Sequence, residues 1–323
     1  MGRNRKKDKH LPKNVYMRSG GYYFVDYEGK WHNLGRNFAL AMQKYGLLAD
    51  ARHCETMSEV IDRYLREIAP LKAESTYKDN IKQSKYLRAA FGRMRPVQVT
   101  PKMVYQYMDE RGKNSQVQAN REIALLSHMF KKAIRWGFVS TNPVKGIERF
   151  KEKPRERYVT DEEFNAFKDF AGPEIAAYLD FKLLTGLRKG DILRLKRSDI
   201  QDDGIHAYIS KTRKTIVIEW TDALRDAVDA ILNLKKPIYS ISLFRTRRGQ
   251  PYSVDGFNSI WQRKMRKALE EGVLKERFTD HDIRAKTGSD TSEAHAVELL
   301  AHDDPRTTKK HYRRKDSVVR PLK

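Results

Sequence analysis

The spacing of apolar residues changes along the chain from the period of a strand to the period of a helix. Between residues 14 and 36, aromatic and β-branched residues are interrupted by two glycine-containing turns, a pattern that predicts two or three short strands. Residues 38–50 then predict one short helix. Residues 1–13, with six basic residues and one acidic residue, precede the strands and are expected to form a flexible arm.

The next section, residues 55–150, has helical spacing throughout. Thr56 and Glu59 form the pattern of a capping box, and apolar residues follow at intervals of three and four positions. The predicted helices cover residues 57–68, 75–91, a stretch that begins at Thr100-Pro101, and 116–136. A charged stretch that contains a proline, residues 148–159, then indicates a linker.

The last section, residues 151–323, combines helices with one hairpin. A second capping box at Thr160 and Glu163 opens it, and the strands "HAYIS" and "IVIEW" flank the basic turn "KTRK" at residues 211–214. The whole chain therefore predicts a multidomain, mainly α fold with small β elements. Its expected parts are a small three-stranded N-terminal sheet with a helix over residues 1–54, a helical module over 55–150 and a mixed α+β module over 151–323.

The charge of the chain points to a partner. The 323 residues carry 65 Lys and Arg against 42 Asp and Glu, a net charge of +23. The excess is +7, +9 and +7 over residues 1–54, 55–153 and 154–323, so no single tail accounts for it. A chain that is positive in every section favours a polyanionic partner, and nucleic acid is the leading candidate. A merely soluble basic protein fits this excess poorly, and an anionic membrane surface is disfavoured because no basic amphipathic helix stands alone.

Several classes of chemistry have no support in the sequence. The single cysteine, Cys54, excludes an intrachain disulfide and a cysteine zinc site, and no histidine spacing matches a metal motif. No glycine-rich phosphate loop indicates the use of ATP. No apolar run is long enough for a membrane span, and no apolar signal segment follows the basic N-terminus. A cytoplasmic protein without cofactor or metal is therefore expected.

Two fragments of the last section place arginine and histidine at structurally marked positions. In "LLTGLRKGD" an apolar helix breaks at Thr185-Gly186, and Arg188 begins the next helix. In "FTDHDIRAK" His281 and Arg284 lie three positions apart, on one face of a helical turn. Each fragment alone is a weak signal, because a basic protein contains such combinations by chance.

Three further residues complete the candidate set. Lys211 lies in the hairpin turn, where a flexible ammonium group can reach an oxyanion, and His302 follows the apolar run "LLA". Tyr312 is surrounded by lysine, arginine and histidine, a setting that attracts an anion. A surface tyrosine in a basic tail is the more ordinary interpretation when these residues are taken alone.

Together these groups suit attack on a phosphodiester by a tyrosine. Phosphoryl transfer needs positive charge on the non-bridging oxygens, a proton acceptor for the nucleophile and a proton donor for the leaving oxygen. Arginines can supply the charge, because the planar guanidinium contacts two phosphate oxygens in a fixed geometry. Each of these residues is therefore a candidate for one of the roles that this chemistry needs.

Taken in order, Gly-Leu-Arg-Lys-Gly-Asp, the hairpin lysine, His-Asp-Ile-Arg, Leu-Leu-Ala-His and the final tyrosine resemble the catalytic domain of tyrosine recombinases. "LPKNVYMRSGGYYFVDYEGKWHNLGR" resembles the arm-type DNA-binding domain of lambda-type phage integrases, and "WGFVSTNPVKGI" resembles the end of their core-binding domain. The resemblance covers the whole chain. It implies an arm-binding domain over residues 1–54, a core-binding helical domain over 55–150 and a catalytic domain over 151–323.

The resemblance also implies a site-specific recombinase and a role for each candidate residue. Arg188 and Arg284 are implied to bind the scissile phosphate, and His302 to form a hydrogen bond with one of its oxygens. Tyr312 is implied to be the nucleophile that forms a 3′-phosphotyrosyl bond, with His281 as its general base. Lys211 is implied to give a proton to the leaving 5′ oxygen, and Asp191 to be a supporting carboxylate. The implied partners are double-stranded DNA at core and arm attachment sites, a synaptic homotetramer, a host DNA-bending protein and an excisionase. No cofactor is implied, because the covalent link stores the phosphodiester bond.

The sequence departs from the family pattern at three places. The usual Leu-Gly-His is Leu-Ala-His, and Ala285 replaces a histidine that many relatives carry. The gap from His302 to Tyr312 is one residue longer than in most relatives, within a stretch where a cap followed by proline predicts a short helix over residues 305–314. Ser289, Thr307 and Thr308 are poorer nucleophile candidates, because the sequence indicates no base beside them.

Two alternative functions stay open at this point. A type IB topoisomerase shares this chemistry but relaxes supercoils without exchanging DNA partners, and the arm-like N-terminus favours an integrase over it. A non-catalytic DNA-binding regulator derived from a recombinase is disfavoured, because all six catalytic residue types are present.

Overall fold

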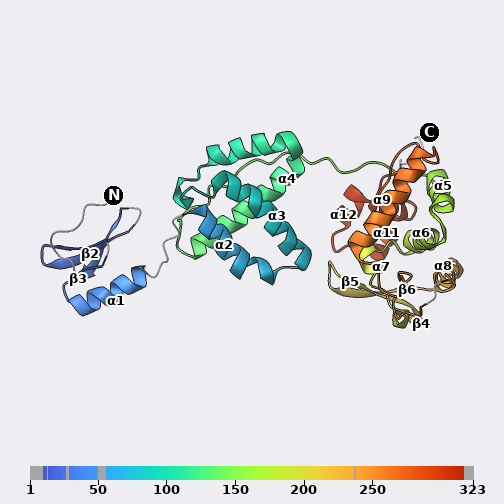
Figure 1. The fold of residues 1–323 in the computed structure, drawn as a ribbon, viewed down its shortest axis with the longest axis horizontal. Coiled ribbons are helices and arrows are strands. Elements are labelled where there is room, and N and C mark those ends of the chain that lie inside the picture. The colour runs from blue at the N-terminus through green and yellow to red at the C-terminus, as the bar shows by residue number, and fades with distance from the viewer. Residues whose placement is uncertain (1–9, 13, 27–28, 50–55, 236–237, 316–323) are drawn as a thin grey trace, which may run out of the picture. The chain divides into compact units, whose positions relative to one another are not determined.

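The computed structural model describes residues 10–12, 14–26, 29–49, 56–235 and 238–315. The chain divides into two compact units, residues 1–152 and 153–323 (Figure 1). The predictions for most of the basic arm, for Cys54 and for the residues after 315 lie outside the described residues. Within the described ranges, no helix is long and apolar enough to cross a membrane.

The predicted N-terminal sheet is confirmed as three antiparallel strands followed by a helix. The strands are β1 (Val15–Arg18), β2 (Gly21–Val25) and β3 (Trp31–Gly35), in the order β1-β2-β3, and the helix is α1 (Phe38–Ala49). Val15 faces Phe24 across the first pair, and both side chains are buried with Leu34 and Ala41. Alternate strand residues therefore point into a small core that α1 covers.

The helical section follows, with α2 (Met57–Glu67), α3 (Glu74–Phe91) and the long α4 (Pro101–Arg135), and with single 3-10 turns at Ala69–Leu71 and Pro96–Gln98. Thr56 caps α2 by accepting a hydrogen bond from the backbone N–H of Glu59, which is one half of the predicted capping box. The third and fourth predicted helices are the two halves of α4, which are divided by the non-helical backbone of Ser115.

A buried ion pair holds the two halves of α4 together. Arg111, before the break, donates to both carboxylate oxygens of Glu122, which lies after it and is 1 % exposed. The Tyr107 hydroxyl donates to the same carboxylate at 2.6 Å. Because breaking a buried pair leaves an uncompensated charge, separation of the two halves at this contact is unfavourable.

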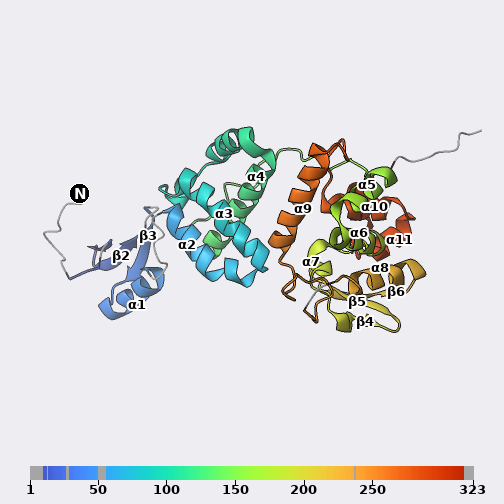
Figure 2. The same ribbon diagram turned by 45° about the vertical axis from the view of Figure 1, so that its right-hand side comes forward.

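The C-terminal unit contains most of the elements. They are α5 (Asp161–Ala171), α6 (Pro173–Thr185), α7 (Lys189–Ile192), a 3-10 turn (Arg197–Asp199), β4 (Ile200–Gln201), β5 (Gly204–Ile209), β6 (Lys214–Glu219), α8 (Asp222–Leu232), α9 (Val254–Glu270), α10 (Asp280–Ser289), α11 (Glu293–Leu299) and α12 (Pro305–His311). The predicted hairpin is β5 and β6, and the unpredicted β4 adds a third antiparallel strand. In both ribbon views this sheet lies at the end of the unit opposite α5 (Figure 1, Figure 2).

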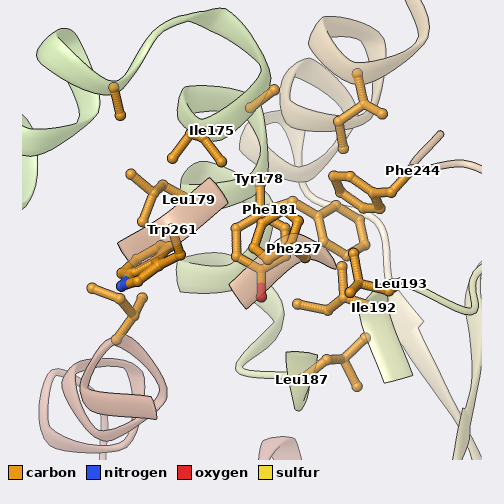
Figure 3. Close-up of a cluster of buried hydrophobic side chains, with 14 of the residues drawn as sticks. Ile175, Tyr178, Leu179, Phe181, Leu187, Ile192, Leu193, Phe244, Phe257 and Trp261 are labelled. Carbon is orange, nitrogen blue, oxygen red and sulfur yellow. The ribbon is translucent and has the colours of Figure 1, made fainter. Parts of the chain in front are cut away.

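The core of this unit surrounds α6. The helix is apolar around most of its circumference, which is typical of a helix buried on several sides. Figure 3 shows the rings of Tyr178, Phe181 and Phe257 together in this core, with Trp261 and Phe244 beside them. The ring centroids of Tyr178 and Phe257 are 4.4 Å apart. This packing fixes α6, and with it the turn that α6 leads into.

Candidate active site

The turn after α6 requires the glycine that the sequence places there. Gly186 has a φ of 59°, in the left-handed region, and a Cβ added to it would lie 2.8 Å from the Leu300 side chain. Arg188 follows at the cap of α7, so the predicted break and restart of the helix are confirmed. The turn therefore presents Arg188 at the start of α7 and packs its own backbone against the residues before His302.

Arg284 is held at the centre of the site by backbone carbonyls. Its side chain is 1 % exposed, and its two terminal nitrogens donate to the carbonyl of Gly186 and, at 2.6 Å, to that of Leu300. Burial lowers the pKa of Arg284 to about 10, and the nearby Arg188 adds to this effect. The guanidinium stays charged near neutral pH and its orientation is fixed before any ligand binds.

Each arginine keeps one buried N–H group without a protein acceptor among the described residues. These groups are Nη1 of Arg188 and Nε of Arg284. Buried donors without acceptors are uncommon in folded proteins because the desolvation of each costs about 1–3 kcal/mol. An anion with several acceptor oxygens, such as a phosphate, would satisfy both groups at once.

His302 connects Arg284 to α12. Its Nε2 lies 3.2 Å from a terminal nitrogen of Arg284, and its Nδ1 lies 2.7 Å from the hydroxyl of Thr308. Because arginine only donates hydrogen bonds, Nε2 accepts and Nδ1 carries the proton. Burial, and then Arg284, lower the pKa of His302 to about 4, so the ring is neutral at pH 7. Thr308 is fully buried and holds this tautomer in place.

Tyr312 is a buried residue of the site rather than a surface tyrosine. It is 6 % exposed and packs on Ala285 and Leu300. The centroid of its ring lies 4.7 Å from that of His302, 5.3 Å from that of His281 and 5.4 Å from the Arg284 guanidinium carbon. The ordinary interpretation of a tyrosine in a basic tail is therefore wrong for this residue.

The helix before Tyr312 is shorter than predicted. It covers Pro305–His311 rather than residues 305–314, with Asp304 as its cap and Tyr312 as the first residue beyond it. The Tyr312 N–H still donates to the Thr308 carbonyl at 2.9 Å, but the Tyr312 carbonyl and the Arg314 N–H bond to Ser289 of α10, so the helix ends at this point. The side chain of Tyr312 thus leaves the helix end toward His281 and His302.

The remaining predicted residues border the same place. His281 is exposed at one edge, and burial of the rest of its ring, followed by the charges of Lys182 and Arg284, lowers its pKa to about 4. Lys211 is exposed in the turn after β5, near enough for its charge to lower the pKa of His302. The structure therefore brings these two residues to the group formed by the arginines, His302 and Tyr312.

Asp191 joins α7 to the hairpin that carries Lys211. Its carboxylate is buried and accepts two hydrogen bonds from Ser210, from the backbone at 3.2 Å and from the hydroxyl at 2.9 Å. Arg194 pairs with the same oxygen. Because Ser210 precedes Lys211, Asp191 anchors the base of the lysine turn next to Arg188.

A buried ion pair that the sequence reasoning missed lies beneath the site. The ammonium of Lys182, 1 % exposed, donates to the carbonyl of Leu187 at 3.1 Å and pairs with Asp280 at 3.1 Å. The Tyr178 hydroxyl donates to the same carboxylate at 2.5 Å. The pair ties the turn before Arg188 to the residue before His281. The signal for it in the sequence was a lysine within a largely apolar helix.

The alanine in Leu-Ala-His has a structural consequence. Ala301 has a φ of 47°, in the left-handed region that favours glycine. A non-glycine residue there costs about 1–2 kcal/mol. Ala301 therefore adopts, with strain, a backbone conformation that a glycine would adopt without it, immediately before His302.

We expect the C-terminal unit to lose stability as the pH falls from 6.5 towards 4. The unfolded chain protonates His302 at its ordinary pKa of 6.5, whereas the folded chain lowers that pKa to about 4. Between these values the unfolded state binds more protons, so the free energy of unfolding decreases with falling pH, and this contribution becomes constant below 4. Urea unfolding measured from about pH 7 to about pH 5 should show that the free energy of unfolding changes less with pH in His302→Asn than in the wild-type chain. His295→Asn, on the exposed side of α11, is the control, and an equal slope in both variants would refute the low pKa.

The comparisons with known proteins identify the family. Two arginines, two histidines and a buried tyrosine on this fold define a tyrosine recombinase, and the model of the phage integrase family matches residues 157–317. The chain belongs to the phage integrase family. It is 27% identical over 337 residues to the integrase of Enterobacteria phage 434 and 26% identical over 337 residues to that of Escherichia phage lambda, with 94% of each chain covered in both cases.

The solved structures support the fold over the full length. A crystal structure of a lambda integrase dimer bound to a core site matches with a TM-score of 0.71 at 22% identity, covering 98% of this chain and 99% of that one. The Tn1549 transposon integrase in complex with circular intermediate DNA matches with a TM-score of 0.66 at 14% identity, covering 80% of this chain and 95% of that one. The predicted mainly α fold with small antiparallel sheets is thereby confirmed.

Proposed function

We propose that this integrase cuts and rejoins attachment-site DNA through a 3′-phosphotyrosyl intermediate, and so integrates and excises a mobile element. The observation that carries the proposal is the position of the Tyr312 ring beside Arg284 and His302, with an unpaired buried N–H on each of two arginines. A scissile phosphate bound to Arg188 and Arg284 would lie next to the tyrosine. The site then has the charge, the nucleophile and the proton carriers that transesterification needs.

In the proposed reaction, the hydroxyl oxygen of Tyr312 attacks the phosphorus and the bond from phosphorus to the 5′ oxygen breaks. His281 accepts the tyrosine proton, which its low pKa permits because the ring is neutral at pH 7. Lys211 gives a proton to the leaving 5′ oxygen, and the exposed turn gives its side chain the freedom to reach it. A 5′ hydroxyl from another strand reverses these steps and rejoins the DNA, so no ATP is needed.

His302 changes its role when DNA binds. In the free chain its Nε2 accepts from Arg284 and has no proton to offer a phosphate. A phosphodiester anion beside the ring raises the pKa of His302 and favours protonation at Nε2. The ring then donates to a non-bridging oxygen, while Thr308 still holds Nδ1. We therefore assign to His302 a phosphate contact that forms together with proton uptake.

The proposed partners follow from the relatives and from the charge. Solved lambda integrase structures are a dimer bound to a core site and a tetramer bound to a Holliday junction. For this chain we propose double-stranded DNA at core and arm sites, a synaptic homotetramer, a host DNA-bending protein and an excisionase. The net charge of +23 suits the many phosphate contacts involved. The bacterial cytoplasm, in association with the nucleoid, is the proposed place of action.

A suicide substrate tests the reaction and separates it from the alternatives. A nick near the cleavage point releases a short fragment after attack, so the covalent adduct accumulates. Adduct on the full-length chain is expected, and its absence would favour the DNA-binding regulator. Two duplexes with attachment-site sequences should then exchange strands, whereas relaxation of supercoils without exchange would favour the topoisomerase.

We also propose that residues 1–54 bind arm sites separately from residues 55–150, which bind the core site. The strand face of the N-terminal sheet exposes Trp31 and Tyr16, whose ring centroids lie 5.6 Å apart, and the Arg18 guanidinium lies 5.8 Å from the Trp31 ring. Aromatic and basic groups on an exposed sheet suit contact with nucleic acid.

Deletion of residues 1–54 is expected to preserve cleavage of a core site and to abolish complete integration. Core cleavage by adduct formation and integration into a full attachment site should be measured on the same preparations. Trp31→Ala in the full-length chain tests the strand face directly and should weaken arm binding alone. Normal integration by the truncated chain would contradict this domain assignment.

A further inference from the structure

A second group of polar side chains lies on the side of α10 away from His281 and Arg284. Asp282, Lys286 and Ser289 are spaced by four and three positions, so they share one face of the helix. All three are buried, at 2 %, 1 % and 8 % exposed. Buried polar groups of this kind are hydrogen-bonded, and the partners of Asp282 and Ser289 include the Tyr312 carbonyl and Arg314, two positions after the tyrosine.

Ser289 binds the backbone of the tyrosine segment. Its hydroxyl donates to the carbonyl of Tyr312 at 2.8 Å and accepts from the backbone N–H of Arg314, also at 2.8 Å. Gly288 lets this backbone approach closely, because a Cβ there would lie 3.1 Å from the Cβ of Tyr312 and 3.3 Å from its carbonyl oxygen. The main chain of Tyr312 thus rests directly on α10.

The side chain of Arg314 adds a second set of contacts two residues after Tyr312. Its side chain is 5 % exposed and donates to the carboxylate of Asp282 at 2.6 Å, to the carbonyl of Arg157 at 3.2 Å and to that of His311 at 3.0 Å. A buried arginine with these partners is not available to the DNA backbone. Its contacts order the chain immediately after the tyrosine.

Asp282 stays charged in this setting. Burial alone would raise its pKa, but hydrogen bonds from Thr279 and Arg314 outweigh burial and hold the pKa below its usual range. The carboxylate also caps the start of α10 through the backbone of Thr279 at 2.8 Å, and it pairs with Arg155 at 3.2 Å. The acceptor of Arg314 is therefore part of the rigid helix that carries His281 and Arg284.

We propose that Arg314 is a positioning residue for Tyr312, and that Arg314, Asp282 and Ser289 form a latch that seats the tyrosine opposite the scissile phosphate. This inference rests on the proposed function, since it assigns the latch to the attack by Tyr312. One helix, α10, then fixes both the phosphate ligand Arg284 and the backbone of the nucleophile. The distance between the bound phosphate and the tyrosine is thus set by contacts with a single helix.

Arg314→Gln tests the latch with Arg313→Gln as its matched control. Both variants lose one positive charge, but Arg313 is exposed and bonds only to the carbonyl of Thr291 among the described contacts. Asp282 keeps Thr279 and Arg155 in the Arg314 variant, so α10 stays capped. Ser289→Ala removes the second half of the latch without altering charge.

Amide hydrogen exchange of the free protein measures the latch without any catalysis. Exchange over residues 309–315 is expected to be faster by about tenfold or more in Arg314→Gln and Ser289→Ala, because hydrogen bonds to charged or buried groups oppose opening. Exchange over α5 should be unchanged. Equal exchange of the segment in Arg314→Gln and Arg313→Gln would overturn the latch.

Single-turnover cleavage of a suicide substrate measures its effect on the reaction. At saturating DNA, the cleavage rate constant of Arg314→Gln should fall by a factor on the order of ten to a hundred relative to Arg313→Gln. The Kd for DNA should agree within about twofold, as expected for a group that acts on the attack and not on binding. Equal rate constants would overturn the positioning role. A wild-type chain that forms no adduct would instead refute the proposed function, and the exchange result would stand apart from it.

Discussion

Arg188→Lys is expected to lose DNA cleavage by a factor on the order of a hundred or more while DNA binding is retained. Lysine keeps the positive charge, but its single ammonium cannot present the fixed pair of N–H groups that a guanidinium gives to a phosphate. The half-buried side chain of Arg188 leaves Nη1 unpaired, so the substitution removes a donor that no protein group uses. The cleavage rate constant at saturating suicide substrate and the Kd for DNA decide the result.

Arg284→Lys is expected to give the same loss together with a loss of stability. The two terminal nitrogens of Arg284 donate to the carbonyls of Gly186 and Leu300. The single ammonium nitrogen of a lysine cannot take both positions, so one of these buried carbonyls loses its hydrogen bond. The expected decrease in the free energy of unfolding is about 1–3 kcal/mol. Arg266→Lys, on the exposed side of α9, is the control for the substitution itself. Near-normal cleavage by both site variants would contradict the phosphate contacts assigned to them.

The sequence predicted those parts of the site that local chemistry determines. Gly186 could be placed because an apolar helix has to end where a left-handed residue follows it. Arg188 then occupies the start of the next helix, and Lys211 the turn between two strands. In each case the position depends on residues only a few places away, so a pattern of short range was sufficient.

The contacts that hold the site together could not be predicted in this way. Lys182 and Asp280 are 98 positions apart, and Asp282 and Arg314 are 32 apart, so nothing in their local sequence indicates that they meet. The apolar residues that pack on Tyr312 are also distant in sequence, since Ala285 lies in α10 and Leu300 follows α11. The basic residues that adjoin Tyr312 in the chain favoured an exposed tyrosine. In the folded chain, however, its ring also packs on the apolar residues Ala285 and Leu300.

The longer gap before Tyr312, which the resemblance to the family indicates, is compatible with the same packing. The segment from His302 to Tyr312 holds one residue more than in most relatives, yet both of its ends are fixed. His302 is bound by Arg284 and Thr308, and the carbonyl of Tyr312 is bound by Ser289. Both ends are therefore held by residues of α10, and Tyr312 lies beside Arg284 and His302 with the longer segment between them.

Tyr312→Phe is expected to bind DNA with unchanged affinity and to form no covalent adduct at all. The substitution removes one oxygen and leaves the ring, whose contacts with Ala285, Leu300 and the two histidines hold the segment in place. Removal of the nucleophile abolishes the chemical step, whereas binding depends on phosphate contacts that the ring does not make. Gel electrophoresis of denatured reactions with a suicide substrate measures the adduct, and the wild-type adduct should map to the peptide that contains Tyr312.

Thr308 is the alternative nucleophile that this experiment has to exclude, because the structure places a possible base beside it that the sequence did not indicate. Its hydroxyl lies 2.7 Å from Nδ1 of His302, so a potential base is beside it. The residue is fully buried, however, and its hydroxyl oxygen accepts a hydrogen bond from Nδ1–H, so this nitrogen cannot take the hydroxyl proton. Thr308→Val should therefore keep the adduct on Tyr312 at a reduced rate, because only the orientation of His302 is affected. Adduct that persists in Tyr312→Phe and disappears in Thr308→Val would transfer the role of nucleophile to the threonine, and with it the geometry proposed for the whole site would be wrong.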